Sequence, residues 1–428
     1  GIEEVRGTLK RKRYLRIKGI HPGDTLYVYV EAVSGNLRPI VRLQDFGGKA
    51  LAIANFKGES TAAALKYRFP RYMRNCMVIV SGTLRDKTVT TGDYRALIGV
   101  NAPEILEGKG EAGGNPVLEK PVPVKIGIKM QQISNVDQRS ENFGVVATLM
   151  MKWEDPLLAF RPDAAQTRAQ VYTRESFTRK LSEEGRMWPD YSIYNQQGNR
   201  WIQNSVAVVF ADGRVLYLER FTVTLQAPDF DFRQFPFDKQ SFFIRVDSIF
   251  PLWFFAFEDL EGFSEAGNQL GEEEWIVTGV DTSVDRAELA ERPVSRFTFH
   301  FRARRHLTYY AFRIFLPLLI IIVVSWIIFF LRDYTKRVDA SGANLLLFIA
   351  FNFAISSDLP RLGYMTFLDM LLAAVFVVTA LMLILAVLVR RLVSDGRDLL
   401  VSRIDRYVIW FYPFAYIVGL LIVILVYR

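Results

Sequence analysis

The polar segment between residues 339 and 358 carries the side chains best suited to ion chemistry. Steps of three and four residues from Asp339, which follow one face of an α-helix, select Ala343, Leu346, Ala350, Phe353 and Ser357. Copies of this stripe around one axis would form apolar rings at Leu346 and Phe353 that expel water, and a carboxylate ring that attracts cations. Ordinary helix packing, with Asp339 as a surface cap, explains the same pattern.

Four apolar segments supply the elements that such a stripe requires. They cover residues 314–331, 340–357, 370–389 and 407–427. A run of about twenty residues is long enough to cross the hydrocarbon core of a bilayer. The second segment is unusually polar, with Asn344 and Asn352 among its residues. We therefore expect it to face protein or water rather than lipid.

The formal net charge of +8 is explained by basic residues beside these segments. Arg332, Lys336 and Arg337 lie between the first and second segments, and five arginines lie between the third and fourth. The turn between the second and third segments, residues 358–366, contains one basic residue, Arg361. The positive-inside rule then places both basic loops in the cytosol, and the N-terminal half and the C-terminus outside. Since membrane topology explains the positive charge, we do not expect nucleic-acid binding.

The N-terminal three hundred residues alternate apolar and polar side chains with period two, which favours antiparallel sheets. We expect an accessory β-sandwich at residues 1–115, a second β-sandwich without a helix at 116–305, and a four-helix membrane domain at 306–428. The single cysteine, Cys76, cannot form an intrachain disulfide. No signal peptide precedes Gly1, so we expect a processed or truncated chain.

Several motifs resemble those of the Cys-loop family of pentameric ligand-gated ion channels. Phe235-Pro236-Phe237-Asp238 is similar to the core of the loop that names the family, and Trp188-Pro189-Asp190 to its first ligand-binding loop. Arg304-Arg305, shortly before Pro317, is similar to the junction into the first membrane helix. Where animal members carry the two loop cysteines, this chain has Pro228 and Phe242, which resembles the prokaryotic branch. The accessory sandwich lies outside the family's core.

This resemblance implies a homopentamer in the cell membrane, gated by an unknown small ligand or ion at its extracellular domain. Five copies of the stripe would line the pore, with the gate at Leu346 and Phe353. The Asp339 ring would gather permeating inorganic cations at the cytosolic mouth. The alternative is a membrane-anchored sensory or adhesion receptor without a pore, although a mere anchor has no use for a polar second segment.

The resemblance also places Asp238 and Arg305 at the junction between the extracellular domain and the membrane, beside Asp137, Pro236 and Pro360. An acid and a base held there can couple movement of one domain to the other. The alternative is an exposed ion pair, which contributes under about 1 kcal/mol.

The family binds amines in an aromatic box at subunit interfaces, where cation–π attraction needs several rings around one charge. Tyr194 stands at one matching position, but Thr148 and Ile249 stand at others, and residues 281–293 contain no aromatic side chain. An amine ligand therefore fits this cleft poorly, and Tyr194 is equally well explained as a packing residue.

Acidic residues are dense near the same cleft, including Glu272, Glu273 and Glu274. Several carboxylates together favour hard cations, so calcium is a candidate modulator there, although a solvated acidic face is the simpler explanation. No other cofactor is expected. Enzymatic activity is not expected either, because the three histidines are dispersed and the sequence contains no phosphate-binding glycine loop.

Overall fold

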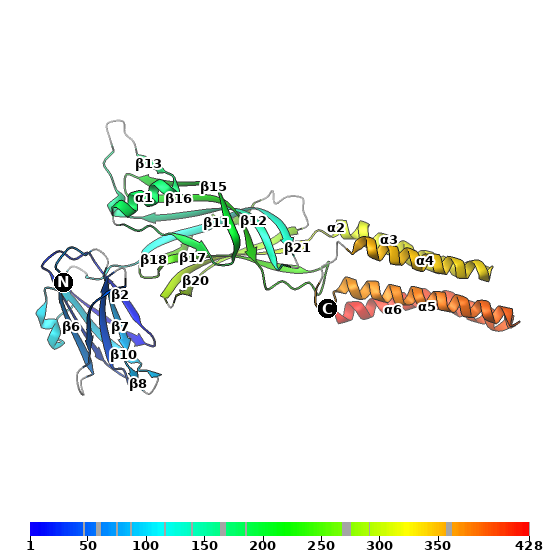
Figure 1. The fold of residues 1–428 in the computed structure, drawn as a ribbon, viewed down its shortest axis with the longest axis horizontal. Helices are drawn as coiled ribbons and strands as arrows, with labels where there is room; N and C mark the ends of the chain where they lie inside the picture. Colours follow the sequence, from blue (N-terminus) through cyan, green and yellow to red (C-terminus); the bar gives the residue numbers. More distant parts are fainter. Residues whose placement is uncertain are drawn as a thin grey trace.

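The computed structural model describes residues 1–45, 48–56, 61–73, 76–85, 88–114, 117–137, 140–162, 168–184, 186–267, 275–290, 292–356 and 362–427. The molecule is elongated (Figure 1), with an N-terminal β-sandwich at one end, membrane helices at the other and a second β-sandwich between them.

The N-terminal sandwich consists of two four-stranded antiparallel sheets. One sheet has the order β1 (Ile2–Leu9), β10 (Gly92–Val100), β3 (Thr25–Ala32) and β6 (Ala62–Arg68); the other has β2 (Arg13–Ile17), β7 (Cys76–Gly82), β4 (Pro39–Asp45) and β5 (Ala50–Asn55). Val28 and Ile98 of the first sheet share a buried core with Val41 and Val78 of the second. A small hairpin, β8 (Leu84–Arg85) with β9 (Thr88–Val89), and a 3₁₀ turn, η1 (Pro103–Glu107), complete this part. The expected sandwich is confirmed.

The second sandwich is built from longer strands. Its larger sheet has the order β13 (Ala169–Tyr172), β15 (Gln196–Phe210), β16 (Arg214–Gln226), β12 (Asn142–Glu154), β11 (Val122–Asp137) and β18 (Phe255–Asp259), with β19 (Glu265–Ala266) on β11; the smaller has β14 (Tyr191–Ile193), β17 (Lys239–Pro251), β21 (Arg292–Arg305) and β20 (Trp275–Leu289). The short turn η2 (Pro156–Leu158) follows β12. Side chains of both sheets, such as Leu149 and Phe299, share one core. The second expected sandwich is therefore also confirmed.

The expectation of a second sandwich without a helix is wrong, because α1 (Arg174–Glu183) lies on this domain. The hydroxyl oxygen of Thr173 accepts a hydrogen bond from the Ser176 amide and caps the helix. Only Phe177 and Leu181, one turn apart, are buried. Two apolar side chains in ten residues give a weak helical signal, so sequence periodicity missed the helix.

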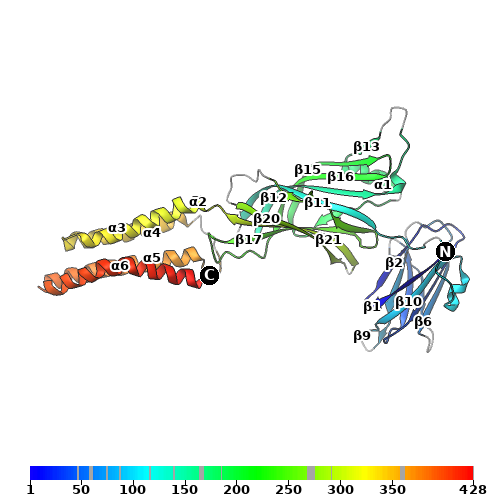
Figure 2. The same cartoon turned by 180° about the vertical axis from the view of Figure 1, so that it is seen from behind.

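Among the described residues, four helical spans are long and apolar enough to cross a membrane, as expected. The first is composed of α2 (Leu307–Tyr310), the π-helical turn η3 (Ala311–Phe315), α3 (Leu316–Ile327) and η4 (Ile328–Phe330). The others are α4 (Tyr334–Ile355), α5 (Phe367–Ser394) and α6 (Asp398–Val426), and all four lie alongside one another in both views (Figure 2).

Caps explain why two spans begin earlier than hydropathy alone predicts. The Asp333 carboxylate accepts hydrogen bonds from the Thr335 and Lys336 amides, so α4 begins six residues before the apolar segment. Thr366 and Asp369 form a capping box at the start of α5. Only three residues separate α5 from α6, so the connection between the third and fourth spans is short.

Candidate functional site

Helix α4 presents two different faces. One face, which includes Arg337, Ser341 and Phe348, is buried against the other helices of the chain. The predicted pore stripe lies on the uncovered side: Asp339, Ala343, Leu346, Ala350 and Phe353 are all exposed. The exposed fractions of Leu346 and Phe353 are 67% and 76%. The described part of the chain therefore leaves the stripe free to face a lumen or a second subunit; Ser357 lies outside the described residues.

The polar character of α4 is partly used within the chain. Asn344 is buried, and its Nδ2 donates to the Ser325 hydroxyl over 3.1 Å and to the Ile321 carbonyl over 3.4 Å. This asparagine therefore faces the first span, so it satisfies the expectation that the segment turns toward protein or water.

The arginine in the first turn of α4 points away from the stripe. The side chain of Arg337 is only 3% exposed, and its Nη1 lies 2.6 Å from Oδ1 of Asp405 on α6. Its Nη2 also donates to the carbonyls of Phe329 and Leu331. A guanidinium paired in this way contributes little positive field to the side of α4 that carries Asp339.

The junction between the sandwich and the helices contains a buried ion pair. Nε of Arg305, at the end of β21, donates to Oδ1 of Asp238 over 2.9 Å, and the two side chains are 0% and 1% exposed. Gln240 donates to the second carboxylate oxygen over 2.7 Å, and Arg305 Nη1 donates to the Tyr310 hydroxyl over 3.1 Å. The Arg305 guanidinium also lies 4.3 Å from the ring centroid of Trp275. The alternative of an exposed ion pair is therefore wrong.

The loop around Pro236 inserts aromatic side chains between the ends of the membrane helices. Phe235 is fully buried and packs edge-on against Tyr310, with ring centroids 5.3 Å apart. Phe237 packs against Phe315 of the first span and Phe367 of α5. The structure thus brings Pro236, Asp238 and Arg305 together at one junction.

The other two predicted coupling residues are Asp137 and Pro360. Asp137 accepts hydrogen bonds from the amide and the hydroxyl of Ser140 in its own turn, over 3.1 and 2.7 Å. Pro360 lies outside the described residues.

The predicted ligand cleft already contains a cation from the same chain. Tyr194 is 61% exposed, and the Arg296 guanidinium lies 4.0 Å from its ring centroid. Both carboxylate oxygens of Asp247 hold this guanidinium, over 2.6 and 2.7 Å. Thr148 lies on β12, where it accepts a hydrogen bond from Gln131, and Ile249 lies on β17 with 43% exposure. An arginine in the place of an amine ligand disfavours amine binding at Tyr194.

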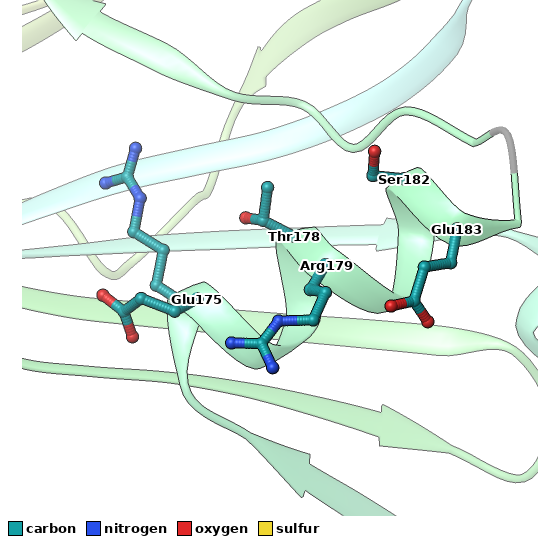
Figure 3. A pocket seen from close by; sticks show the side chains of 6 residues that line it. Glu175, Thr178, Arg179, Ser182 and Glu183 are labelled. Carbon is teal, nitrogen blue, oxygen red and sulfur yellow. The ribbon is translucent and has the colours of Figure 1, made fainter.

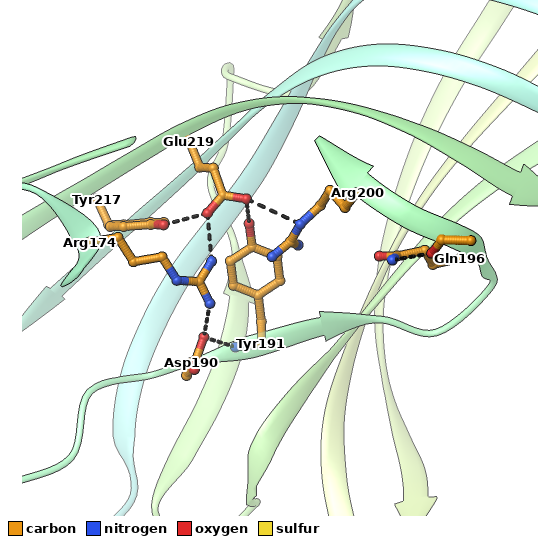
Figure 4. Close-up of polar contacts among 8 residues, drawn as sticks. Arg174, Asp190, Tyr191, Gln196, Arg200, Tyr217 and Glu219 are labelled. Atoms are coloured by element: carbon orange, nitrogen blue, oxygen red, sulfur yellow. Dashed lines mark hydrogen bonds and ion pairs between the residues drawn. The ribbon is translucent and has the colours of Figure 1, made fainter. Parts of the chain in front are cut away.

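A charged network that the sequence reasoning missed lies inside the second sandwich (Figure 4). Glu219 is fully buried; its carboxylate pairs with Arg174 over 2.7 Å and with Arg200 over 3.4 Å, and accepts hydrogen bonds from the Tyr191 and Tyr217 hydroxyls. Burial and the neighbouring carboxylate raise the pKa of both tyrosines, so they stay protonated donors.

The network extends to the motif at Trp188-Pro189-Asp190. Arg174 Nη2 also donates to Asp190 over 2.8 Å. Burial raises the pKa of Asp190, and the Arg174 charge opposes that rise. The signal was present in the sequence: Glu219 occupies an inward position of β16, between Tyr217 and Phe221 in the period-two pattern.

Two further features carry no site. A cleft of about 450 Å³ runs along α1 (Figure 3), where Arg179, Glu175 and Glu183 mix both signs of charge and select no ligand chemistry. The described residues contain no group of three or more potential metal ligands. Glu272, Glu273 and Glu274 lie outside the described residues, so the calcium hypothesis stays a prediction.

Comparison with known proteins points in the same direction as the motifs. Residues 113–251 match the family model of the neurotransmitter-gated ion-channel ligand binding domain. The chain is 29% identical over 257 residues to a proton-gated ion channel of Gloeobacter violaceus, over 59% of this chain and 68% of that protein. It is 25% identical over 279 residues to the gamma-aminobutyric acid receptor subunit beta of Lymnaea stagnalis, and 22% over 275 residues to the rho-2 subunit of Bos taurus. These matches cover 60% of this chain and 53% and 55% of the two subunits, about half of their length.

Proposed function

We propose that this chain, which belongs to the pentameric ligand-gated ion-channel family, assembles as a homopentamer whose α4 helices line a cation-conducting pore. The observation that carries the proposal is the uncovered stripe of α4. Apolar Leu346 and Phe353 and acidic Asp339 share the face that the described part of the subunit leaves exposed. In five copies around an axis, that stripe would line a shared lumen.

The distribution of charge supports cations as the permeant ions. Asp339 is exposed on the stripe, whereas Arg337 is paired with Asp405 on the opposite side of the helix. Lys336, in the first turn of α4 and three residues before Asp339, lies 4.0 Å from the N-cap residue Asp333. A carboxylate ring whose neighbouring bases are each paired with another acid attracts cations and repels anions.

The extracellular domain is the proposed sensor. Arg296 over Tyr194 makes an organic amine a poor agonist, so a proton, a divalent cation such as calcium, or a small anion is the favoured class of stimulus. The relative from Gloeobacter violaceus is described as proton-gated. The buried pair of Asp238 and Arg305 would transmit the stimulus to the helices.

Bilayer recording tests this proposal. The purified chain should give unitary currents in a planar bilayer as pH, divalent ions and small organic anions are varied, and native mass spectrometry should find five copies of the 49.1-kDa chain. A membrane-anchored receptor without a pore would give no current under any of these conditions, and a different copy number would contradict the homopentamer.

A further inference from the structure

A pocket of about 280 Å³ lies where the two sandwiches meet. Arg42, Met77 and Ile79 come from strands of the N-terminal sandwich, whereas Trp253 and Arg292 come from the second sandwich. We call this space the seam pocket. Because both sandwiches supply its walls, a molecule bound there would contact both at once.

Positive charge dominates the seam pocket. Among the described residues, Lys12, Arg42 and Arg292 line it, against the single carboxylate of Asp45. Asp45 accepts a hydrogen bond from the Lys49 amide over 2.8 Å. All three basic side chains are exposed, and none pairs with a carboxylate within 4.0 Å among the described residues. Three cations against one carboxylate around one cavity favour an anion.

One wall of the seam pocket is aromatic. Tyr14 of β2 stacks on Trp253 with ring centroids 4.1 Å apart and an interplanar angle of 15°. Met77 and Ile79 extend this apolar surface. The indole Nε1–H of Trp253 is buried and has no hydrogen-bond acceptor among the described residues.

We propose that the seam pocket binds a small organic anion that carries one acidic group and a flat apolar part, such as an aromatic carboxylate. The acidic group pairs with Arg42 and Arg292, one from each sandwich, and the apolar part lies against the wall of Tyr14 and Trp253. Charge-assisted bonds to guanidinium groups supply direction, and the apolar wall distinguishes this class from small inorganic anions.

The location of Arg292 connects this ligand with the membrane. Ala290 and Arg292 lie at the tip of the hairpin formed by β20 and β21, where Leu289 pairs with Arg292. The same strand, β21, ends at Arg305, which pairs with Asp238 immediately before the first membrane span. Its fourteen residues span about 45 Å at the usual rise of a strand.

The N-terminal sandwich also contacts this hairpin through an ion pair between Arg11 and Glu288. A ligand in the seam pocket therefore adds to an existing attachment of the hairpin tip. On the channel function proposed above, such a ligand would fix the tip and change the equilibrium between closed and open states.

Calorimetric titration of the purified full chain with benzoate tests the site. We expect saturable binding of benzoate, much weaker binding of acetate, which lacks the flat part, and no binding of benzamidine, its cationic counterpart. Arg42→Gln and Arg292→Gln should each raise the dissociation constant about tenfold or more, since each removes a hydrogen bond to a charged group. Arg179→Gln, which removes an exposed guanidinium from α1, should leave it unchanged.

The outcomes separate this site from the channel proposal. The site would be overturned if benzoate did not bind or if benzamidine bound equally well. It would also be overturned if benzoate binding survived both Arg42→Gln and Arg292→Gln. If acetate bound as tightly as benzoate, the aromatic wall would have no role in binding. Binding needs no current, so a chain that binds benzoate but conducts nothing would refute the pore and leave the site standing. If the channel conducts, benzoate should change its open probability in the parent and not in Arg292→Gln; equal responses would overturn the link through β21.

Discussion

Arg305 and Asp238 form a fully buried ion pair, 2.9 Å long, at the point where the last strand of the extracellular domain becomes the first membrane helix. Gln240, Tyr310 and Trp275 surround the pair, so its hydrogen-bonding groups have partners from both sandwich and helix. A pair that is so enclosed holds the two domains in one relative arrangement, and its loss leaves an isolated charge in an apolar site.

Single substitutions of this pair should therefore impair gating and folding together. Asp238→Arg or Arg305→Asp leaves like charges buried in contact, and breaking a buried pair costs about 3–5 kcal/mol. The exchanged double variant should partly restore open probability in bilayer recordings and the thermal midpoint of the purified protein. A double-mutant cycle isolates the pair from its surroundings. Strictly additive effects would show that the two residues act through other partners.

The apolar rings make a second prediction. Leu346→Ser should wet the proposed constriction and raise spontaneous opening in bilayer recordings, because a hydrophobic gate closes by expelling water. Leu345→Ser is the control, since Leu345 is partly buried on the same helix and no step of three or four residues joins it to the stripe. A Leu346→Ser channel that reaches the membrane and stays as silent as the parent would place the gate elsewhere.

Glu219 makes a prediction about stability. Glu219→Gln removes the charge that neutralises Arg174 and Arg200 in the core, so the free energy of unfolding should fall by about 3–5 kcal/mol. Glu258→Gln, at an exposed position of the same domain, should change it little. Denaturant unfolding followed by far-ultraviolet circular dichroism measures both, and equal values for the two variants would contradict a structural role of the network.

Features that repeat along the sequence could be predicted, whereas single contacts between distant residues could not. Period-two alternation and hydropathy were sufficient for both sandwiches and the four spans, because burial on one face repeats over many residues. Local motifs placed Asp238 and Arg305 together, but their complete burial depends on Trp275 and Tyr310 from elsewhere in the chain. No periodic signal reports such a contact.

Two other features escaped prediction for the same reason. Helix α1 has only two apolar anchors, and its position depends on a sheet that sequence periodicity does not locate. The seam pocket joins Arg42 and Arg292, which are 250 residues apart in the chain. Contacts between distant segments are set by tertiary packing, which overrides local pattern.

His300 predicts a dependence of stability on pH. Its ring stacks on Phe243 with centroids 4.5 Å apart, and burial lowers the pKa of the imidazole below the ordinary value of 6.5, while Asp281 acts in the opposite direction. The unfolded chain then binds the proton more readily than the folded chain. Stability is therefore present above pH 6.5 and is lost as the pH falls through the lower pKa of the folded state.

Lowering the pH from about 7.5 to 5.5, the range around the ordinary histidine pKa, should accordingly lower the thermal midpoint of the parent protein. The decrease should be smaller in His300→Phe. His21→Phe, at an exposed position of the N-terminal sandwich, is the control and should keep the parental dependence. If His300→Phe shows the same fall as the parent, another group carries the pH dependence.

Ion selectivity depends on which charges reach the pore stripe. Asp339 is exposed on that stripe, two residues after Arg337, yet the Arg337 guanidinium lies on the buried side of α4 against Asp405 of α6. An arginine two residues away on a helix does not share the same face. The charge of Arg337 is therefore neutralised by a partner on the other side of α4, and Lys336, three residues before Asp339, lies 4.0 Å from Asp333.

We expect the reversal potential under a sodium chloride gradient to lie near the sodium equilibrium potential. Asp339→Asn should move it toward zero, because five carboxylates leave the narrow mouth of the pore. Asp405→Asn tests whether pairing with Asp405 neutralises Arg337. This substitution frees the charge of Arg337 and should also weaken the preference for cations, although Asp405 lies off the stripe. Asp395→Asn, in the connection between α5 and α6, is the control for loss of an acid that pairs with no base among the described residues. A parental value near the chloride equilibrium potential would refute cation selectivity, and an unchanged value in Asp339→Asn would assign the selectivity to another ring.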